Sequence, residues 1–378
     1  MAAVVLARTL LANAHSTLST SASFRTVINV PPAPFSLGPD SRALFLGSCF
    51  AENIGERLRR ASLAALVNPS HGIVYNPLSL AAALERIASA APYGPADLQP
   101  CAHDPSRLVS FAHHSRFGGR AGVDTELARM NRALEHAHAH LRTSDVLFLT
   151  LGTSWAFARD GAVVANCHKQ PAAAFERVFI GADNAAAALA RAVAAARSVS
   201  PRLRVVVTVS PVRHWKDGAV DNSLSKATLL VAAHQLVRTL GKEAASYFPA
   251  YELLMDDLRD YRFYANDMLH PSGPAIDYIW RAFTAAYLAL DAAERIAAVE
   301  AVRTAAAHRP MDGDSAAVRQ FGAAQFRKAD EIERRWGLHA GRALAGEREH
   351  FARLRDGEPL RWADADADAE EQPESGPR

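Results

Sequence analysis

Three unbroken apolar runs constrain the fold of this chain more than any other feature. They occur in RALFLGS (42–48), DVLFLTLG (145–152) and RLRVVVTVS (202–210), and each ends in small or polar residues. Strands of a parallel sheet show such runs, because helices cover both faces of the sheet. The runs therefore predict buried parallel strands with polar turns at their carboxyl ends.

Segments of helical character follow these runs. Residues 51–66 place apolar side chains at helical steps, and the alanine-rich segment 184–198 is periodic in the same way. The second segment is a crossover helix that returns the chain for parallel pairing. Further helix is expected over 225–248 and 275–307. The pattern predicts an α/β layer sandwich.

The composition argues against a nucleic-acid-binding protein. The 378 residues are 49% hydrophobic and 22% charged, which is enough apolar material for one well-buried main domain. Lys and Arg total 42 against 40 Asp and Glu, a formal net charge of +2. Since this balance creates no field that attracts a polyanion, nucleic acid is not an expected partner. The oligomeric state is left open.

Cysteine usage and hydropathy indicate a compartment. The three cysteines, Cys49, Cys101 and Cys167, form no C-x-x-C pair and no disulfide framework, which fits a reducing environment. No stretch of about 18 apolar residues occurs, so a conventional membrane span is excluded. The first 23 residues suggest a flexible arm, with a cleaved targeting segment as the alternative. We expect a cytoplasmic protein.

Composition shifts divide the chain into four segments. An N-terminal arm and a Pro/Gly-rich loop occupy 1–40, and the main domain occupies 41–307. A helical extension with alternating charge is expected over 308–356. The remainder, 357–378, is acidic and lacks apolar anchors, so it is expected to be disordered.

A serine stands at the junction of the first expected strand and the helix behind it. Ser48 lies at the carboxyl edge of the predicted parallel sheet, where open α/β folds bind ligands. The N–H groups of Cys49 and Phe50 open the helix without partners and can donate to an oxyanion. We expect Ser48 to be a nucleophile, against the alternative of a plain helix N-cap.

A serine nucleophile needs an adjacent base, and the turn NDMLHP (266–271) offers one. In this Asp-x-x-His turn the carboxylate of Asp267 can reach Nδ1–H of His270 and leave Nε2 free to accept the serine proton. Pro271 restricts the backbone of the turn. Ser48, His270 and Asp267 together predict a catalytic triad.

These residues also carry a resemblance. The segment GSCFA (47–51) spells the signature for which the GSCFA family is named, a group that resembles a branch of the SGNH/GDSL hydrolase superfamily. The similarity covers roughly residues 42 to 285. Further segments that resemble the family are HGIVYNP (71–77), HHS (113–115), LGTSW (151–155), VANCHK (164–169), TVSPVRH (208–214) and YRFY (261–264), which runs into Asp267 and His270.

The resemblance implies a fold and roles by position. The fold would be a three-layer α/β/α sandwich with a parallel sheet, flavodoxin-like and of SGNH hydrolase type, plus the C-terminal helical extension. Gly47 and Ser48 would replace the Gly-Asp-Ser nucleophile block, with glycine in place of the usual aspartate. Gly72 would supply an oxyanion N–H, and Asp267 with His270 would form the last block.

The third block departs from the SGNH pattern. In place of Gly-x-Asn-Asp the chain has Gly152-Thr153-Ser154-Trp155, so the asparagine donor is missing. The Ser154 hydroxyl is expected to stand in for it. Loss of one oxyanion donor costs a factor of about 10² to 10³ in rate.

Other residues were weighed for roles at the site. Cys49 is intrinsically the better nucleophile if the helix N-terminus lowers its pKa, but we expect a small buried thiol. Arg213 and His214 follow the third strand and are expected to hold an anionic or sugar-like part of a substrate. Asn76 and His114 are expected near the cleft because the resembling segments include them.

No metal site is predicted. His136 and His140 share a helix face, but the H-E-x-x-H order and a third ligand are missing, so a solvated face is preferred. Cys167 and His168 lack partners at ligand spacing, so structural or substrate-lining roles are expected for them.

The predicted function is that of a serine esterase or acyl hydrolase without a cofactor, acting on a small acyl ester. A carbohydrate-directed esterase or an acyltransferase shares the same triad. The alternative from another class is an SGNH-like domain that binds a ligand or partner without turnover, which the altered third block favours. The expected partner is a small-molecule or glycan ester.

Overall fold

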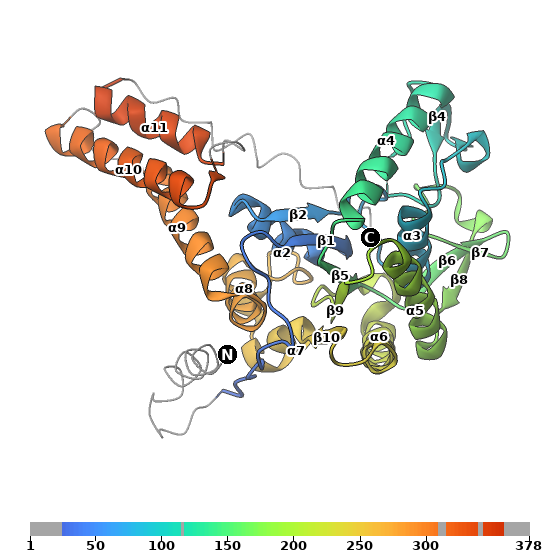
Figure 1. Cartoon of the computed structure of the whole chain (residues 1–378). Helices are drawn as coiled ribbons and strands as arrows, with labels where there is room; N and C mark the ends of the chain where they lie inside the picture. Colours follow the sequence, from blue (N-terminus) through green and yellow to red (C-terminus); the bar gives the residue numbers. More distant parts are fainter. Residues whose placement is uncertain (1–24, 115–116, 309–314, 339–342, 359–378) are drawn as a thin grey trace.

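The computed structural model describes residues 25–114, 117–308, 315–338 and 343–358 (Figure 1). Most of the predicted N-terminal arm and nearly all of the predicted acidic tail lie outside these ranges. Within them, none of the helices combines the length and the apolarity of a membrane span.

A five-stranded sheet forms the centre of the molecule. Its order is β10-β9-β5-β1-β2, and every neighbouring pair is parallel. Counted along the chain within this sheet alone, the order is 2-1-3-4-5, that of flavodoxin-like folds. The strands are β1 (Arg42–Gly47), β2 (Ala64–Val67), β5 (Val146–Leu151), β9 (Arg204–Val209) and β10 (Ala245–Phe248).

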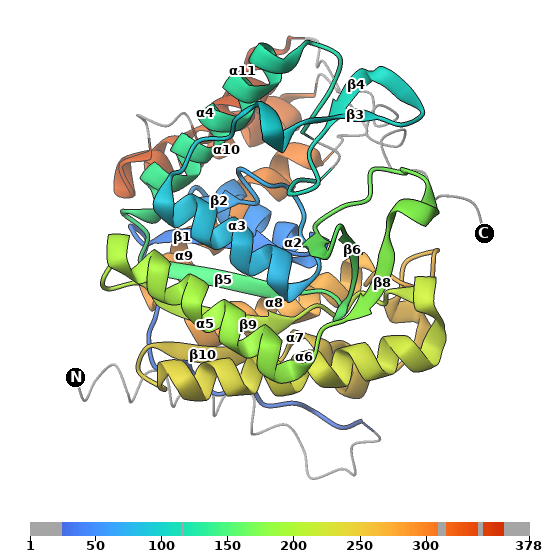
Figure 2. The same ribbon diagram turned by 90° about the vertical axis from the view of Figure 1, so that its right-hand side faces the viewer.

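Both faces of the sheet are buried, which explains the unbroken apolar runs. Leu44 and Leu46 of β1 point into one hydrophobic cluster, and Ala43 and Phe45 point into another on the opposite face. Helices pack on both faces (Figure 2). The first face is covered by α3 (Pro77–Ser89), α4 (Val123–Leu141), α5 (Ala182–Val199) and α6 (Gly218–Leu240). The second is covered by α2 (Cys49–Arg60) and α8 (Gly273–Tyr287), with further buried residues from 250–258 and 292–296. The predicted three-layer fold is confirmed.

Smaller elements border the carboxyl edge of the sheet. β3 and β4 form an antiparallel pair, and β6 pairs with both β7 and β8. The strands are β3 (Gln99–Cys101), β4 (Asp104–Val109), β6 (Trp155–Arg159), β7 (Ala162–Val164) and β8 (Glu176–Phe179). Short helical turns are η1 (Pro95–Asp97), η2 (Ala172–Ala174), η3 (Trp215–Asp217), α7 (Ala250–Glu252), the π-helix η4 (Leu253–Leu258) and η5 (Tyr261–Phe263).

Two expected helices are shorter than predicted, because each is followed by a strand. Helix α6 ends at Leu240, and Gly241 has a φ of 84°, a left-handed conformation that stops a helix. The expectation of helix through residue 248 was wrong, since 245–248 is strand β10. Likewise α2 ends at Arg60, and the last residues of the expected helix 51–66 belong to β2.

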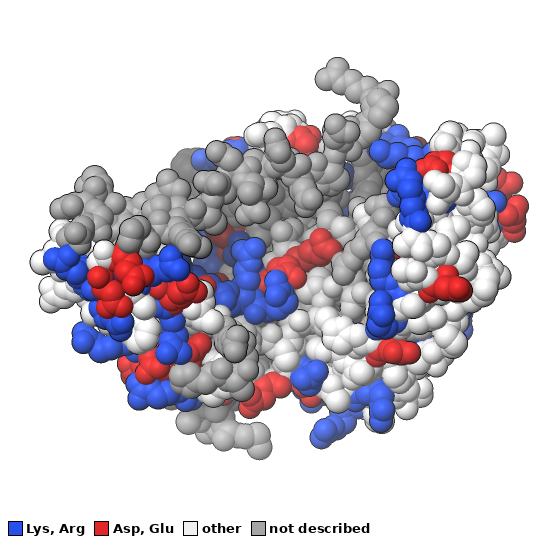
Figure 3. All heavy atoms as spheres, turned by 90° about the horizontal axis from the view of Figure 1, so that it is seen from above, with Lys and Arg blue, Asp and Glu red and all other residues white. Residues whose placement is uncertain are grey.

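The C-terminal helices form a lobe of their own beside the sheet (Figure 1). The expected helical segment 275–307 is divided at Leu288 and Ala289, where the chain pairs with Leu37. Helix α9 (Leu290–Ala307) then packs through Val299 and Val302 against α10 (Ala316–Arg335) and α11 (Ala345–Asp356). Acidic and basic side chains intermingle on this lobe, at the left of Figure 3.

Candidate active site

The sharp turn after β1 begins at Gly47. Its φ is 133°, and a Cβ atom there would overlap the carbonyl oxygen of Thr150 on the neighbouring β5. The N–H of Ser48 donates to the same oxygen at 3.1 Å. Only glycine fits this close approach, which brings residues 48 and 49 to the carboxyl edge of the sheet.

Ser48 caps helix α2. Its side chain is fully buried, and Oγ accepts a hydrogen bond from the N–H of Phe50 at 3.3 Å. No hydrogen bond joins Ser48 to His270 in the part of the chain that the structure describes. The plain N-cap weighed from the sequence is therefore the role that its contacts support.

The residue that follows Ser48, Cys49, interacts with His270. Hydrogen bonding with the Cys49 side chain is the largest influence that raises the pKa of His270, to about 9. Burial opposes the rise, and the hydrogen bond to Asp267 adds to it. Cys49 is partly exposed and carries a free thiol. Of the two adjacent side chains, that of Cys49 rather than that of Ser48 acts on His270.

Asp267 and His270 meet as the turn predicted. Nδ1 of His270 lies 2.6 Å from Oδ2 of Asp267. Oδ1 of Asp267 accepts the N–H groups of Leu269 and His270, both at 2.9 Å. Burial acts to raise the pKa of Asp267, but these donors outweigh it and hold the pKa below its ordinary value. The carboxylate therefore stays ionised and fixes the ring orientation.

Two backbone N–H groups at this edge of the sheet are candidate donors to a substrate. Within the described residues, the N–H groups of Cys49 and Gly72 donate to no acceptor. Gly72 has a φ of 70°, and a Cβ there would lie 2.8 Å from Cβ of His114, so His114 packs directly on this glycine. The N–H of Val74 donates to the Gly47 carbonyl oxygen at 2.9 Å, which ties the Gly72 loop to the turn.

The third block is bound into the fold. The N–H of Gly152 donates to the carbonyl oxygen of Tyr75 at 2.9 Å. Ser154 is fully buried; its N–H donates to Oγ of Ser225 at 2.7 Å, and its hydroxyl donates to the Ser225 carbonyl oxygen at 3.4 Å. The Ser154 hydroxyl is thus directed at an acceptor on α6, and its expected role as a substitute for the asparagine donor stays a prediction.

Asn76 is the N-cap of helix α3. Its Oδ1 accepts the N–H of Ser79 at 2.8 Å, which caps α3, and its Nδ2 donates to the Val164 carbonyl oxygen at 3.3 Å. These bonds support an N-cap role rather than substrate binding.

His214 presents a buried nitrogen beside Gly152. Its Nε2 has no hydrogen-bond partner among the described residues, and a Cβ added to Gly152 would lie 3.2 Å from it. Burial lowers the pKa of His214 to about 3, with further lowering by Lys226, His270 and Arg177. The ring is neutral at neutral pH, so in one of its two tautomers Nε2 carries a proton that it can donate.

Lys226 on α6 was not anticipated from the sequence. Its side chain is buried, and Nζ donates to the carbonyl oxygens of Gly152 at 2.7 Å and Ser210 at 2.8 Å. Burial lowers its pKa to about 7, while Cys49 acts in the opposite direction. The ammonium thus joins the carboxyl ends of β5 and β9 near the thiol. A lysine within a helical pattern carries no sequence signal of this role.

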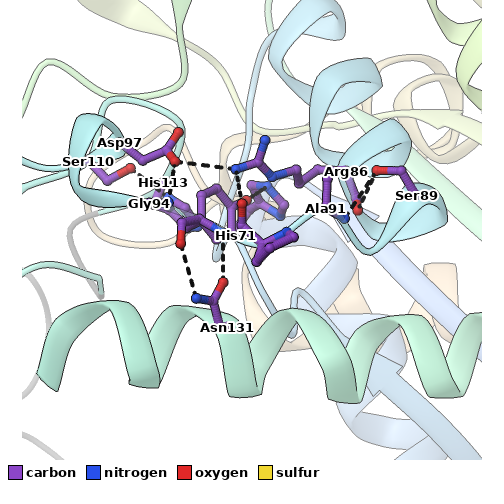
Figure 4. Close-up of polar contacts among 11 residues, drawn as sticks. His71, Arg86, Ser89, Ala91, Gly94, Asp97, Ser110, His113 and Asn131 are labelled. Carbon is purple, nitrogen blue, oxygen red and sulfur yellow. Dashed lines mark hydrogen bonds and ion pairs between the residues drawn. The ribbon is translucent and has the colours of Figure 1, made fainter. Parts of the chain in front are cut away.

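A buried histidine cluster supports the Gly72 loop (Figure 4). His71 binds Oγ of Ser70 through Nδ1 and the hydroxyl of Tyr93 through Nε2, both at 2.7 Å. Its ring stacks on that of His113 with 4.8 Å between centroids. Burial lowers the pKa of both imidazoles, which keeps the stacked rings neutral.

Two further histidines contact backbone carbonyl oxygens. Nε2 of His168 lies 2.7 Å from the Ser110 carbonyl oxygen, and Nε2 of His140 lies 3.0 Å from that of Ala43. Burial raises the pKa of the Cys167 thiol. Among the residues with described positions, no group of three or more His, Cys, Asp or Glu side chains is arranged to hold a metal ion.

Comparison with known proteins identifies the family. No curated protein matched the chain. A solved structure, a carbohydrate esterase family 3 protein from Talaromyces cellulolyticus, is similar at 11% identity and a TM-score of 0.31, over 69% of this chain and 99% of that one. This likeness says nothing about activity. The GSCFA family model matches residues 42–283, most of the chain. The chain therefore belongs to the GSCFA family.

Proposed function

We propose that this protein is an acyl hydrolase in which Cys49, not Ser48, attacks the carbonyl carbon of an ester. His270 is the acid and base, and Asp267 orients its imidazole. The observation that carries the proposal is the position of His270, whose Nδ1 lies 2.6 Å from Asp267 and whose pKa is raised most by the side chain of Cys49.

The protonation state of His270 supports a thiol. A serine hydroxyl must give its proton to a neutral imidazole, but a pKa of about 9 keeps most of the imidazole protonated at neutral pH. A cysteine thiolate paired with an imidazolium is already an active nucleophile. The raised pKa of His270 therefore argues against Ser48 as the nucleophile and supports the sulfur of Cys49.

The reaction balances with these groups alone. The thiolate attacks the ester carbonyl, and His270 gives its proton to the departing alkoxide, leaving a thioester on Cys49. Neutral His270 then takes a proton from water, whose oxygen attacks the thioester. The carboxylic acid leaves, and the thiolate and imidazolium are restored.

Three donors are available for the oxyanion. The N–H groups of Cys49 and Gly72 donate to no acceptor among the described residues, and the helix dipole of α2 favours negative charge at Cys49. We assign the third position, vacated by asparagine, to Nε2 of His214 rather than to Ser154.

The substrate is a small acyl ester, and an ester on a carbohydrate uses the same chemistry. A hydroxyl group in place of water at the second step turns hydrolysis into acyl transfer. An SGNH-like domain that binds without turnover is the outcome if no ester is cleaved.

Hydrolysis of p-nitrophenyl acetate by three variants tests the proposal. Cys49→Ala is expected to lower kcat/KM by about 10³-fold or more, since the nucleophile is lost. Ser48→Ala removes a helix cap, which costs about 1 kcal/mol of stability, and retains most of the activity. Cys167→Ala is the matched cysteine control and retains activity.

The opposite pattern, with Ser48→Ala inactive in folded protein and Cys49→Ala active, overturns the thiol mechanism. Failure of the folded wild-type protein to cleave any acyl ester overturns the assignment as a hydrolase.

A further inference from the structure

A cavity of about 590 Å³ opens beside the triad and shares Asp267 with it. One wall follows β9 and contains Arg213 and Trp215, and the other consists of Met255 and of several residues between Arg259 and Leu269. The N–H of Arg213 donates to the Leu269 carbonyl oxygen at 3.1 Å and joins the two walls. A ligand here therefore lies next to the Asp267–His270 turn.

Two cations in the lining have no anion. Among the described residues, neither Arg213 nor Arg259 forms an ion pair; Arg213 makes only a long contact, 3.7 Å, to the sulfur of Met255 and lies over the ring of Trp215. Guanidinium groups in a concave site bind carboxylates or phosphates with paired hydrogen bonds.

The carboxylates of the cavity are engaged elsewhere. Oδ1 of Asp260 accepts the N–H of Arg262 at 2.9 Å, and Asp267 accepts three donors from its own turn. The charge of Asp267 is offset by the protonated His270. Neither carboxylate reaches the two arginines. Among the described residues, the positive charges of Arg213 and Arg259 are therefore not neutralised by an anion in the cavity.

Flat and apolar groups complete the lining. Trp215 is 47% exposed, Tyr261 80% and Met268 51%, three of the large hydrophobic residues that the described surface leaves exposed. All three line this cavity, with the ring of Tyr264 beside them. Aromatic faces of this kind pack on the ring of a ligand while a polar group fixes its orientation.

We propose that this cavity is a binding subsite for a carboxylate carried on a ring, as in an aromatic acid or a sugar acid, and that the carboxylate belongs to the ester substrate. Arg213 and Arg259 hold the carboxylate, and Trp215 and Tyr261 pack on the ring. The assignment of this group to the substrate rests on the proposed hydrolase function, whereas the binding of the acid does not.

Paired esters test the subsite by selectivity. 4-Acetoxybenzoate is compared with neutral 4-acetoxybenzamide, and acetylated glucuronate with acetylated glucose. The wild-type protein is expected to favour the anionic member of at least one pair by about tenfold in kcat/KM, because a charged hydrogen bond is worth that much or more. The two pairs distinguish an aromatic from a sugar ring.

Charge-removing variants assign the effect to residues. Arg213→Gln and Arg259→Gln are expected to reduce the selectivity ratio about tenfold. Arg262→Gln is the matched control, because this arginine lies in the same segment but outside the cavity lining, and it keeps the ratio. A ratio near one in the wild-type protein, or equal loss in all three variants, overturns the subsite.

Calorimetric titration with 4-hydroxybenzoate and with glucuronate separates this proposal from the hydrolase assignment. Binding that weakens in Arg213→Gln and persists in Arg262→Gln supports the subsite even where no ester is cleaved. Ester cleavage that depends on Cys49, without selectivity and without binding of either acid, leaves the hydrolase intact and overturns the subsite.

Discussion

The side chain of Cys49 is the largest influence on the pKa of His270, although 221 positions separate the two residues in the chain. Asp267 lies 2.6 Å from Nδ1 of the ring. Asp267 fixes the direction of the ring, and in the proposed mechanism the relationship between Cys49 and His270 determines which atom attacks a substrate. The predictions below follow from that arrangement and from the groups around it.

The alkaline limit of activity depends on His270. The hydrogen bond to Cys49 first, and Asp267 after it, raise the pKa of His270 to about 9 against opposing burial. Hydrolysis that needs the imidazolium is therefore expected to fall as the pH rises through about 9. Asp267→Asn removes the charged acceptor and is expected to move this limb of the kcat/KM profile to lower pH. An unmoved limb contradicts the assignment of His270.

The raised pKa of His270 also makes the free energy of unfolding depend on pH. Because the folded pKa of His270 lies above its unfolded value near 6.5, its contribution is complete below pH 6.5 and is lost as the pH rises through about 9. Urea unfolding between pH 6 and 10 is expected to show this loss in the wild-type protein and less of it in Asp267→Asn.

Lys226 stabilises the ends of two strands. Lys226→Met leaves the carbonyl oxygens of Gly152 and Ser210 without their donor, and each unsatisfied buried group costs about 1–3 kcal/mol. Urea unfolding of the variant is expected to show a loss in this range. Lys216→Met, which removes an exposed lysine, serves as the control.

The pKa of Lys226 also determines how the stability lost in Lys226→Met depends on pH. Burial lowers the pKa of Lys226 to about 7, so between pH 7 and about 10.5 the unfolded chain binds more protons than the folded protein at this residue. The stability of the wild-type protein relative to Lys226→Met is therefore expected to rise with pH across that range. A constant difference would show that Lys226 keeps its ordinary pKa.

His214 is expected to act on the transition state. His214→Ala removes the proposed third oxyanion donor and is expected to lower kcat about 10²- to 10³-fold with little change in KM. His214→Gln retains an N–H donor and is expected to recover part of the rate. Ser154→Ala is the comparison, because that hydroxyl is bound to Ser225, and its effect on kcat is expected to be the smaller one. Equal effects contradict the role of His214.

Gly47 controls the turn before the nucleophile. Gly47→Ala forces a Cβ against the Thr150 carbonyl oxygen at a φ of 133°, and a loss of about 3 kcal/mol or more is expected in thermal or urea unfolding. Gly94→Ala is the matched control, since nothing lies within 4 Å of its added Cβ, and its effect is expected to be small.

Much of the fold could be predicted from the sequence, because parallel strands buried on both faces leave long apolar runs. The alternation of Phe45 and Leu46 between two cores makes such a run in β1. Strand β10 could not be recognised, since its four residues follow closely on the long helix α6 and carry no period of their own. Its pairing with β9 is a tertiary effect.

Only the part of the site whose residues lie close together in the sequence could be predicted. Asp267 and His270 are three residues apart, so their contact follows from the turn. The choice between Ser48 and Cys49 depends on which of these two adjacent side chains caps α2, and the sequence alone does not determine this. A signal did exist: read in register with Gly-Asp-Ser, the segment Gly47-Ser48-Cys49 places cysteine in the position of the nucleophile. The contributions of Lys226 and His214 arise only from tertiary packing.

The most direct test is to trap the acyl group and find the atom that carries it. Protein mixed rapidly with p-nitrophenyl acetate, quenched in acid and digested, is expected to carry one acetyl group on the peptide containing residues 48 and 49. A thioester on Cys49 is cleaved by neutral hydroxylamine and is absent from Cys49→Ala but present in Ser48→Ala. An acetyl group that resists neutral hydroxylamine and disappears only in Ser48→Ala would contradict the thiol mechanism.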